Sequence, residues 1–250
     1  MDSLPLKDRI ALVTGATRGI GYQAALGLAR AGAHVIALGR TQGALEALDD
    51  EIFAATGKHA TLAPIDLKEP DGLDALGAHI FERFGRLDVL VHSAAILGAL
   101  TPTGHMDIKR WDDVVSVNLT ATWRIIRSFE PLLRASDAGR AIFLTSGRAV
   151  RPKAFWSAYA ATKAGMEALV RCWADEMEET AIRAVLLDPN TMRTKMRAEA
   201  YPGEDPATVT DPAEIAPLLV QLAQADLGLP DKTVLFSEWK AAGGALPANG

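Results

Sequence analysis

A tyrosine, a lysine and a serine stand where they could transfer a proton. Tyr159 and Lys163 are four residues apart in a helical pattern, so both side chains fall on one face. A free phenol has a pKa of about 10, and a neighbouring ammonium favours its ionised form. Ser146 follows a short apolar run and can hydrogen-bond a substrate oxygen as charge develops on it. These groups suit acid–base chemistry on a carbonyl/alcohol pair, although a tyrosine and a lysine at this spacing also arise by chance.

A glycine-bearing stretch, residues 14–21, follows the first apolar run and leads into a helical pattern. Glycine at such a turn lets the backbone approach a phosphate, and the helix amino terminus offers free N–H groups and a partial positive charge. The alternative is a tight turn that binds nothing. The residues that this loop would offer to a dinucleotide are Gly15, Thr17, Arg18, Gly19, Ile20 and Gly21.

The second apolar run ends in Gly39 and Arg40, where a dinucleotide-binding fold usually carries an acid for the adenosine ribose. Arg18 and Arg40 suit a 2′-phosphate, which a guanidinium binds through forked hydrogen bonds. We therefore predict NADP(H) in preference to NAD(H); the alternative is that both arginines are solvated surface charges. Asp66, after the third run, could accept a hydrogen bond from the adenine amino group or serve as a helix cap or turn acid.

The elements that must position these residues alternate between strand-like and helix-like patterns. Runs of apolar residues predict strands covered on both faces, and the helix-length segments between them predict crossovers in a parallel sheet. The expected strands are 10–14, 34–38, 60–65, 87–91, 141–145, 182–187 and 233–236, and the expected helices are 20–31, 41–56, 70–84, 108–134, 157–179 and 211–225. The stretches 194–212 and from 241 onwards are expected to be loose. Ligands bind such sheets beyond the carboxyl ends of the strands, where the loop 14–21, Asp66 and Ser146 fall.

Composition narrows the possible classes of protein. The chain has 250 residues, which favours one domain spanning 1–250, and its 49% hydrophobic and 23% charged residues exclude a disordered chain. Its formal net charge of −5 argues against nucleic-acid and membrane-surface partners. The lone Cys172, expected to be inert packing in a helix, and the absence of a secretory signal pattern predict a cytoplasmic protein. No histidine has metal-ligand spacing, so no metal is expected, and His92 is interpreted as a satisfied core or strand-end residue.

The combination of motifs resembles the short-chain dehydrogenase/reductase family over nearly the whole chain. The matching motifs are residues 14–21, Asn118 in Val117-Asn118-Leu119, Ser146, and Tyr159 with Lys163. The resemblance implies a single doubly wound Rossmann domain, α/β, with a mainly parallel seven-stranded sheet and helices on both faces. It also implies a hydride passing directly between nicotinamide and carbon.

The same resemblance assigns a role to each member of a catalytic tetrad. Tyr159 would exchange the proton, and Lys163 would lower its pKa while binding the nicotinamide ribose. Ser146 would position the carbonyl. Asn118 would hold a water that links Lys163 to solvent; a helix-kink or surface amide is the alternative for this residue.

Two segments depart from the family pattern. Relatives have Asn-Asn-Ala-Gly where this chain has residues 92–95, so a methyl group is added beside the expected nicotinamide ribose. Relatives have Pro-Gly at 189–190, where Asn190 is compatible with a left-handed turn. Thr194 is expected to contact the nicotinamide carboxamide, with Met192 offering its backbone. The remaining cofactor contacts are expected at Leu67, Ser93, Ala94, Ala95 and Pro189.

Substrate contacts are expected from Ile96, Leu97 and the stretches 147–156 and 194–210. Arg148 could bind an anionic substrate, or it could be an exposed charge or a subunit contact. The helices 108–134 and 157–179 carry more large apolar residues than one sheet face needs, which predicts a homodimer or homotetramer. Those residues are Trp123, Phe129, Met166, Leu169 and Trp173.

Three functions are compatible with these residues. The leading one is an NADP(H)-dependent carbonyl reductase/alcohol dehydrogenase that acts on a small-molecule carbonyl or alcohol. A second is an NADP(H)-binding sensor or scaffold, which only the altered residues 93–95 favour and the complete tetrad opposes. A third is a methyltransferase on a related sheet, which Gly39-Arg40 opposes because such enzymes carry an acid after the second strand.

Overall fold

The computed structural model describes residues 4–228 and 233–246, whose strands form one parallel sheet in the order β3-β2-β1-β4-β5-β6-β7. The chain moves outward from β1 to β3 and then returns to pair β4 with β1. Such a reversal of strand order opens a crevice at the carboxyl ends of the two central strands. The strands are β1 (Ile10–Thr14), β2 (His34–Gly39), β3 (Thr61–Pro64), β4 (Val89–His92), β5 (Arg140–Leu144), β6 (Arg183–Asp188) and β7 (Val234–Leu235).

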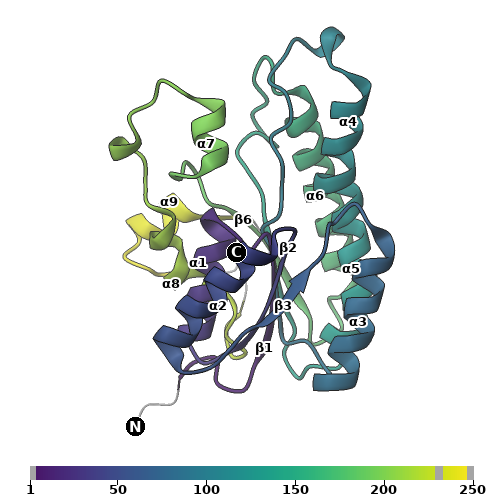
Figure 1. Cartoon of the computed structure of the whole chain (residues 1–250), viewed down its shortest axis with the longest axis vertical. Coiled ribbons are helices and arrows are strands. Elements are labelled where there is room, and N and C mark those ends of the chain that lie inside the picture. The colour runs from purple at the N-terminus through teal and green to yellow at the C-terminus, as the bar shows by residue number, and fades with distance from the viewer. Residues whose placement is uncertain (1–3, 229–232, 247–250) are drawn as a thin grey trace.

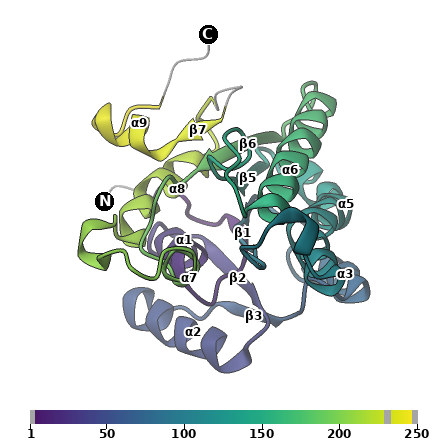
Figure 2. The same cartoon turned by 90° about the horizontal axis from the view of Figure 1, so that it is seen from above.

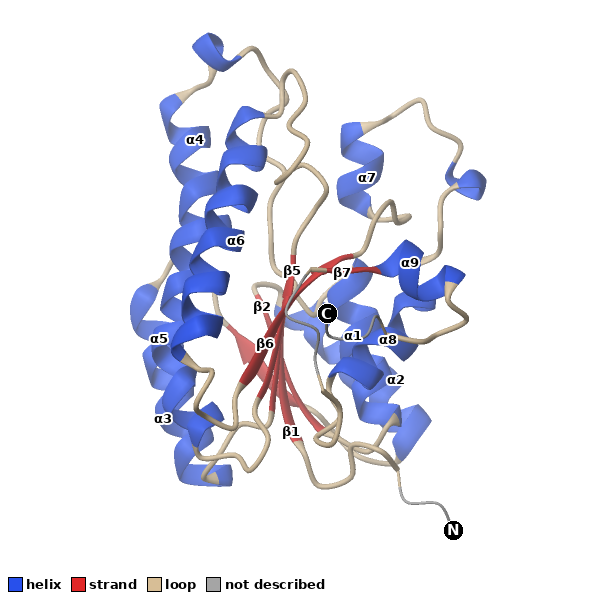
Figure 3. Cartoon of the chain, turned by 180° about the vertical axis from the view of Figure 1, so that it is seen from behind, coloured by secondary structure: helices blue, strands red, loops and turns tan. Residues whose placement is uncertain are grey.

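Helices cover both faces of the sheet, with α1, α2 and α8 on one side and α3, α5 and α6 on the other (Figures 1 and 3). The helices are α1 (Gly19–Arg30), α2 (Gln42–Thr56), α3 (Pro70–Phe84), α4 (Ile108–Val115), α5 (Ala121–Arg134), α6 (Ser157–Glu176), α7 (Lys195–Ala200), α8 (Ala216–Leu222) and α9 (Phe236–Ala241). The predicted Rossmann arrangement of seven parallel strands between helices is confirmed.

Each central strand serves two cores because its successive side chains point to opposite faces. In β1, Ala11 and Val13 pack toward α1 and α8, whereas Leu12 packs toward α3, α5 and α6. All three are 0% exposed. A strand buried on both faces needs a continuous apolar run, which is why the runs in the sequence mark the strands within a few residues.

The predicted helix 108–134 is interrupted. A π turn at Ser116–Thr120 separates α4 from α5, and Asn118 lies inside it. A π turn inserts a residue without changing which positions are apolar, so the helical pattern does not reveal it.

The short helix α7 occupies a stretch that was expected to be loose, and α9 ends where the second such stretch begins. Thr194 caps α7, its Oγ1 accepting a hydrogen bond from the Arg197 backbone N–H at 3.2 Å, and α9 extends to Ala241. Figures 1 and 2 together show α7 above the amino-terminal end of α1, beyond the carboxyl ends of the strands. Of the helices in the described residues, none combines the length and apolar composition needed to span a bilayer.

Burial corrects two sequence-based interpretations. Phe129, Met166 and Trp173 lie in the chain's own core, at 0%, 0% and 3% exposure, so most of the apolar side chains on α5 and α6 need no second subunit. Trp123 is the exception at 49%. Cys172 is exposed and therefore is not core packing, because it lies on the face of α6 that points away from the sheet.

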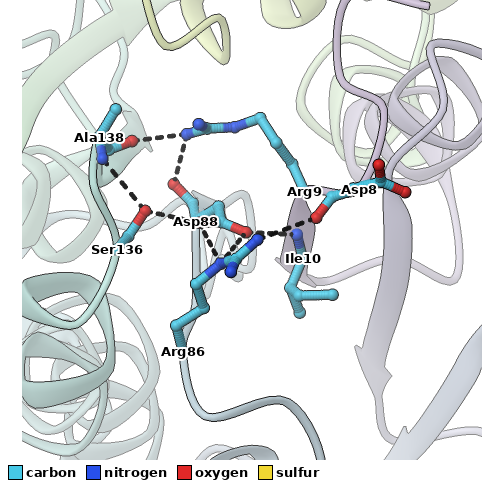
Figure 4. A network of polar contacts seen from close by, with 7 residues as sticks. All are labelled: Asp8, Arg9, Ile10, Arg86, Asp88, Ser136 and Ala138. Carbon is cyan, nitrogen blue, oxygen red and sulfur yellow. Dashed lines mark hydrogen bonds and ion pairs between the residues drawn. The ribbon is translucent and has the colours of Figure 1, made fainter.

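The opposite edge of the sheet, where the strands begin, is tied together by a buried carboxylate (Figure 4). Asp88 is 1% exposed and accepts hydrogen bonds from the Ile10 backbone N–H at 2.8 Å, from Arg86 Nε at 3.0 Å and from Ser136 Oγ at 2.5 Å. The Arg9 guanidinium donates to the backbone oxygens of Asp88 and Ala138. This network joins β1, β4 and β5 far from the carboxyl edge.

Candidate active site

A cavity of about 640 Å³ lies at the carboxyl ends of the strands. Most of the predicted site residues line it, although they come from the loops that follow the strands β1 to β6 and from the helices α1 and α6. They are Gly15, Thr17, Arg18, Gly19, Ile20, Arg40, Asp66, Leu67, Ser93, Ala94, Ala95, Ser146, Tyr159, Lys163, Pro189, Met192 and Thr194. Asn118 and Gly21 do not line it, and neither does Leu97, which is buried at 7% exposure.

The loop between β1 and α1 has the shape that a phosphate requires. Gly15 and Gly19 have φ values of +67° and +57°, which side chains rarely adopt. A Cβ on Gly21 would lie 2.3 Å from the Gly15 carbonyl oxygen, so only glycine allows α1 to begin this close to the loop. No side chain caps α1 and no acid stands in its first turn. Its amino-terminal N–H groups and partial positive charge are therefore available to an anion, which fits the pyrophosphate of a dinucleotide.

Gly39 and Arg40 stand at the end of β2. A Cβ on Gly39 would lie 2.5 Å from Thr17 Cγ2, so a larger residue does not fit there. The Arg40 side chain is 57% exposed, and its NH1 lies 3.9 Å from Asp66 Oδ2. Asp66 also accepts a hydrogen bond from the Lys68 backbone N–H at 3.0 Å, so it is a turn acid that faces the cavity. At this end of the cavity a guanidinium rather than a carboxylate follows β2.

The structure brings Ser146, Tyr159 and Lys163 to one wall of the cavity. Burial raises the pKa of Tyr159 to about 12, a hydrogen bond with Ser146 opposes that rise, and the nearby Asp188 adds to it. Lys163, which the sequence predicts to lower this pKa, is not among the groups that shift it. Lys163 instead donates a hydrogen bond from Nζ to the Leu144 carbonyl oxygen at 2.7 Å. The phenol therefore carries its proton at neutral pH in this structure.

Two buried acids stand beside this wall, and sequence reasoning did not select them. Glu167 and Asp188 are 4% and 7% exposed. Burial lowers the pKa of Lys163 to about 8, and both carboxylates oppose that fall. Burial also raises the pKa of Asp188 above its ordinary value. Asp188 ends β6 at the carboxyl edge, and Glu167 follows Lys163 by one helical turn; both positions were signals that could have identified them.

Asn118 acts on the backbone of the loop after β4. Its Nδ2 donates to the Ile96 carbonyl oxygen and its Oδ1 accepts from the Ile96 N–H, both at 2.9 Å. Nδ2 also lies 3.2 Å from Thr162 Oγ1. The buried amide therefore holds a cavity-lining segment in place and joins it to α6. Its predicted role toward a water stays a prediction.

The two segments that depart from the family pattern, residues 92–95 and 189–190, have backbone conformations that their residues can adopt. None of Ser93, Ala94 and Ala95 has a positive φ, so the extra methyl of Ala95 carries no left-handed strain. Asn190 has a φ of 58°, as its tolerance of left-handed turns allows.

His92 is a satisfied core residue, as interpreted from the sequence. It is 1% exposed, with Nδ1 2.8 Å from Thr14 Oγ1 and Nε2 3.1 Å from Thr122 Oγ1. The Thr14 oxygen also accepts a hydrogen bond from the Ala94 N–H at 3.2 Å. The ring thus links the end of β1 to the cavity-lining residue Ala94.

Comparison with known proteins identifies the family. The family model for short chain dehydrogenases matches residues 9–205. The chain belongs to the short chain dehydrogenase family. The uncharacterized oxidoreductase YciK of Escherichia coli K12 is 38% identical over 223 residues, with 88% of each chain covered. A short chain dehydrogenase of Shigella flexneri 2a, solved in complex with NADP, has a TM-score of 0.89 and 35% identity over 94% of this chain and 99% of its own.

A further relative bears on the choice of cofactor. An uncharacterized NAD-dependent oxidoreductase of Mycobacterium tuberculosis is 32% identical over 76% of this chain and 74% of its own. The family and these relatives show that this protein is an oxidoreductase.

Proposed function

We propose that this enzyme transfers a hydride between NADP(H) and a carbonyl/alcohol substrate, with Tyr159 as the acid or base. The observation that carries the proposal is that Ser146, Tyr159 and Lys163 line one cavity, with the Ser146 and Tyr159 side chains in hydrogen-bond contact. The glycine loop with the free amino terminus of α1 lines the same cavity. A proton donor and a dinucleotide site that share one cavity are what carbonyl reduction requires.

NADP(H), when bound, supplies or accepts the hydride, which is chemistry that no side chain provides. The loop residues Gly15 and Gly19 would hold its pyrophosphate, and Arg18 and Arg40 its 2′-phosphate. The NADP bound by the Shigella relative supports this choice, whereas the name of the mycobacterial relative supports NAD. The cations at this end of the cavity favour NADP(H).

The side chains of this wall can move one proton. In the direction of carbonyl reduction, the Tyr159 hydroxyl donates its proton to the substrate oxygen as charge develops there. A pKa raised to about 12 keeps the phenol protonated at neutral pH, as an acid must be. The Ser146 hydroxyl hydrogen-bonds the same oxygen, and the Leu144 carbonyl oxygen holds Lys163 at the cavity.

A non-catalytic NADP(H) sensor of the same fold is the second candidate, and Ala95 in place of the family's glycine is the observation that favours it. The two functions predict different results for NADPH mixed with a broad carbonyl panel in a stopped-flow instrument. An enzyme oxidises NADPH, and Tyr159→Phe lowers kcat by about 10²- to 10⁴-fold while NADPH still binds. Tyr22→Phe, on α1 and outside the cavity, is the matched control. Undiminished turnover by Tyr159→Phe would exclude the tyrosine mechanism.

Three predictions about the whole protein accompany this function. We infer one domain over residues 1–250, on the grounds of chain length. A homodimer or homotetramer is still predicted, with the half-exposed Trp123 as its remaining support. The single cysteine supports a reducing compartment, the cytoplasm.

A further inference from the structure

Cations gather on the part of the cavity formed by the loop after β5 and by α7. Arg148 and Arg151 come from the loop, and Lys195 and Arg197 come from the helix. These four come from other segments than Arg18 and Arg40, which follow β1 and β2. The apolar side chains of Ile96, Trp156 and Met196 line the cavity with them.

Arg148 is held in a defined position next to the proton donor. Its guanidinium carbon lies 5.2 Å from the ring centroid of Trp156, and that ring meets Tyr159 edge-on at 5.8 Å. Its NH1 donates to the Arg151 carbonyl oxygen at 3.2 Å, and its NH2 lies 3.4 Å from the Tyr201 hydroxyl. One aromatic ring therefore separates this guanidinium from the phenol of Tyr159.

Arg197, which also contacts Tyr201, differs from Arg148 in having a carboxylate partner. Arg197 lies over the Tyr201 ring at 3.8 Å, and it is paired with Glu204 through two hydrogen bonds, one of them 2.6 Å long. In the part of the chain that the structure describes, no ion pair joins Arg148 to a carboxylate. Arg197 thus has its counter-charge inside the protein, whereas the half-buried Arg148 has none.

A half-buried guanidinium without a carboxylate leaves two or more donors free for an external anion. We propose that Arg148 binds an oxyanion, a carboxylate or a phosphate, carried by the substrate. The substrate class is then a carbonyl or alcohol compound with an anionic end and a short apolar body, which Trp156 and Ile96 contact. This inference rests on the proposed function, because it concerns the substrate of the same site.

The first test measures equilibrium binding, which does not depend on turnover. Oxocarboxylates of increasing chain length and their uncharged amides are titrated into the enzyme saturated with NADP⁺, which cannot reduce them. The best acid should bind about 10- to 100-fold more tightly than its amide, as one charge-assisted pair contributes. Arg148→Gln should abolish this ratio, and Arg148→Lys should keep part of it because the charge stays and the fork is lost. Arg30→Gln, an exposed arginine outside the cavity, is the control and should leave the ratio unchanged.

The second test compares kcat/KM for the same pairs with NADPH, together with phosphorylated hydroxyketones and their unphosphorylated forms. A preference for carboxylates or for phosphates that is lost in Arg148→Gln identifies which oxyanion is used. Equal binding of acids and amides, or an acid preference that survives Arg148→Gln, would overturn the inference. Failure of the proposed function would look different: no carbonyl compound would oxidise NADPH, while the binding ratios would still decide the role of Arg148.

Discussion

Acid sensitivity of the fold is predicted by the hydrogen bonds of His92. Thr122 Oγ1 donates its proton to the Asn118 carbonyl oxygen at 3.0 Å, so it accepts from His92 Nε2–H. Nδ1 must then be the acceptor for the Thr14 hydroxyl, whose oxygen receives the Ala94 N–H. This set of bonds is complete only for a neutral ring. A second proton, on Nδ1, would place two hydrogens between Nδ1 and Thr14 Oγ1.

The magnitude follows from the two pKa values. Burial lowers the pKa of His92 to about 3, and Lys163 lowers it further, whereas an unfolded histidine titrates near 6.5. Between those values the unfolded chain binds one proton more than the native chain, so stability rises with pH there and is lost as the pH falls. Integrating this difference from pH 7 to pH 5 gives a loss of about 2 kcal/mol in the free energy of unfolding.

Urea unfolding at pH 7 and at pH 5, followed by tryptophan fluorescence, measures this loss. His92→Asn removes the titrating group, so the stability that this variant loses between pH 7 and pH 5 should be smaller by about 2 kcal/mol. His79→Asn replaces an exposed histidine on α3 and is the matched control. If His92→Asn and the wild type lose equal stability, the neutral buried ring is not the cause and the reasoning is refuted.

Three further substitutions test other parts of the structure. Arg40→Ala should raise the Kd of NADPH about tenfold and leave the Kd of NADH unchanged, because the exposed guanidinium would contact only the 2′-phosphate. Fluorescence titration with both cofactors measures the two Kd values, and equal effects on both would contradict this prediction. Gly21→Ala should weaken the binding of both cofactors by about tenfold, which is about 1.4 kcal/mol, because the added Cβ would collide with the Gly15 carbonyl oxygen. Unchanged affinity would mean that the loop can adjust to the methyl group. Asp88→Ala should lower the free energy of unfolding, measured with urea, by about 3–5 kcal/mol without changing the kcat of the folded enzyme. A loss below about 1 kcal/mol would show that the hydrogen bonds of Asp88 do not stabilise the fold.

Much of the fold and the candidate site could be predicted from the sequence alone. Strands buried on both faces need unbroken apolar runs, and parallel strands need helical crossovers, so local patterns implied the order of elements. The carboxyl ends of those strands meet at one edge, which placed the loop 14–21, Ser146 and the pair Tyr159 and Lys163 together. Glycine at positions 15 and 19 is a local requirement of the backbone, visible in sequence for that reason.

Tertiary structure alone decided the features that depend on contacts between distant residues. The π turn exists around Asn118, whose amide binds the backbone of Ile96, 22 residues away. Burial, not the neighbouring Lys163, sets the pKa of Tyr159, because desolvation depends on what the whole fold packs around the phenol. Phe129 and Trp173, whose apolar side chains suggested a subunit contact, are buried in the core between the sheet and the helices α5 and α6. The sequence shows which residues are apolar or charged, whereas the contacts of each residue are determined by tertiary packing.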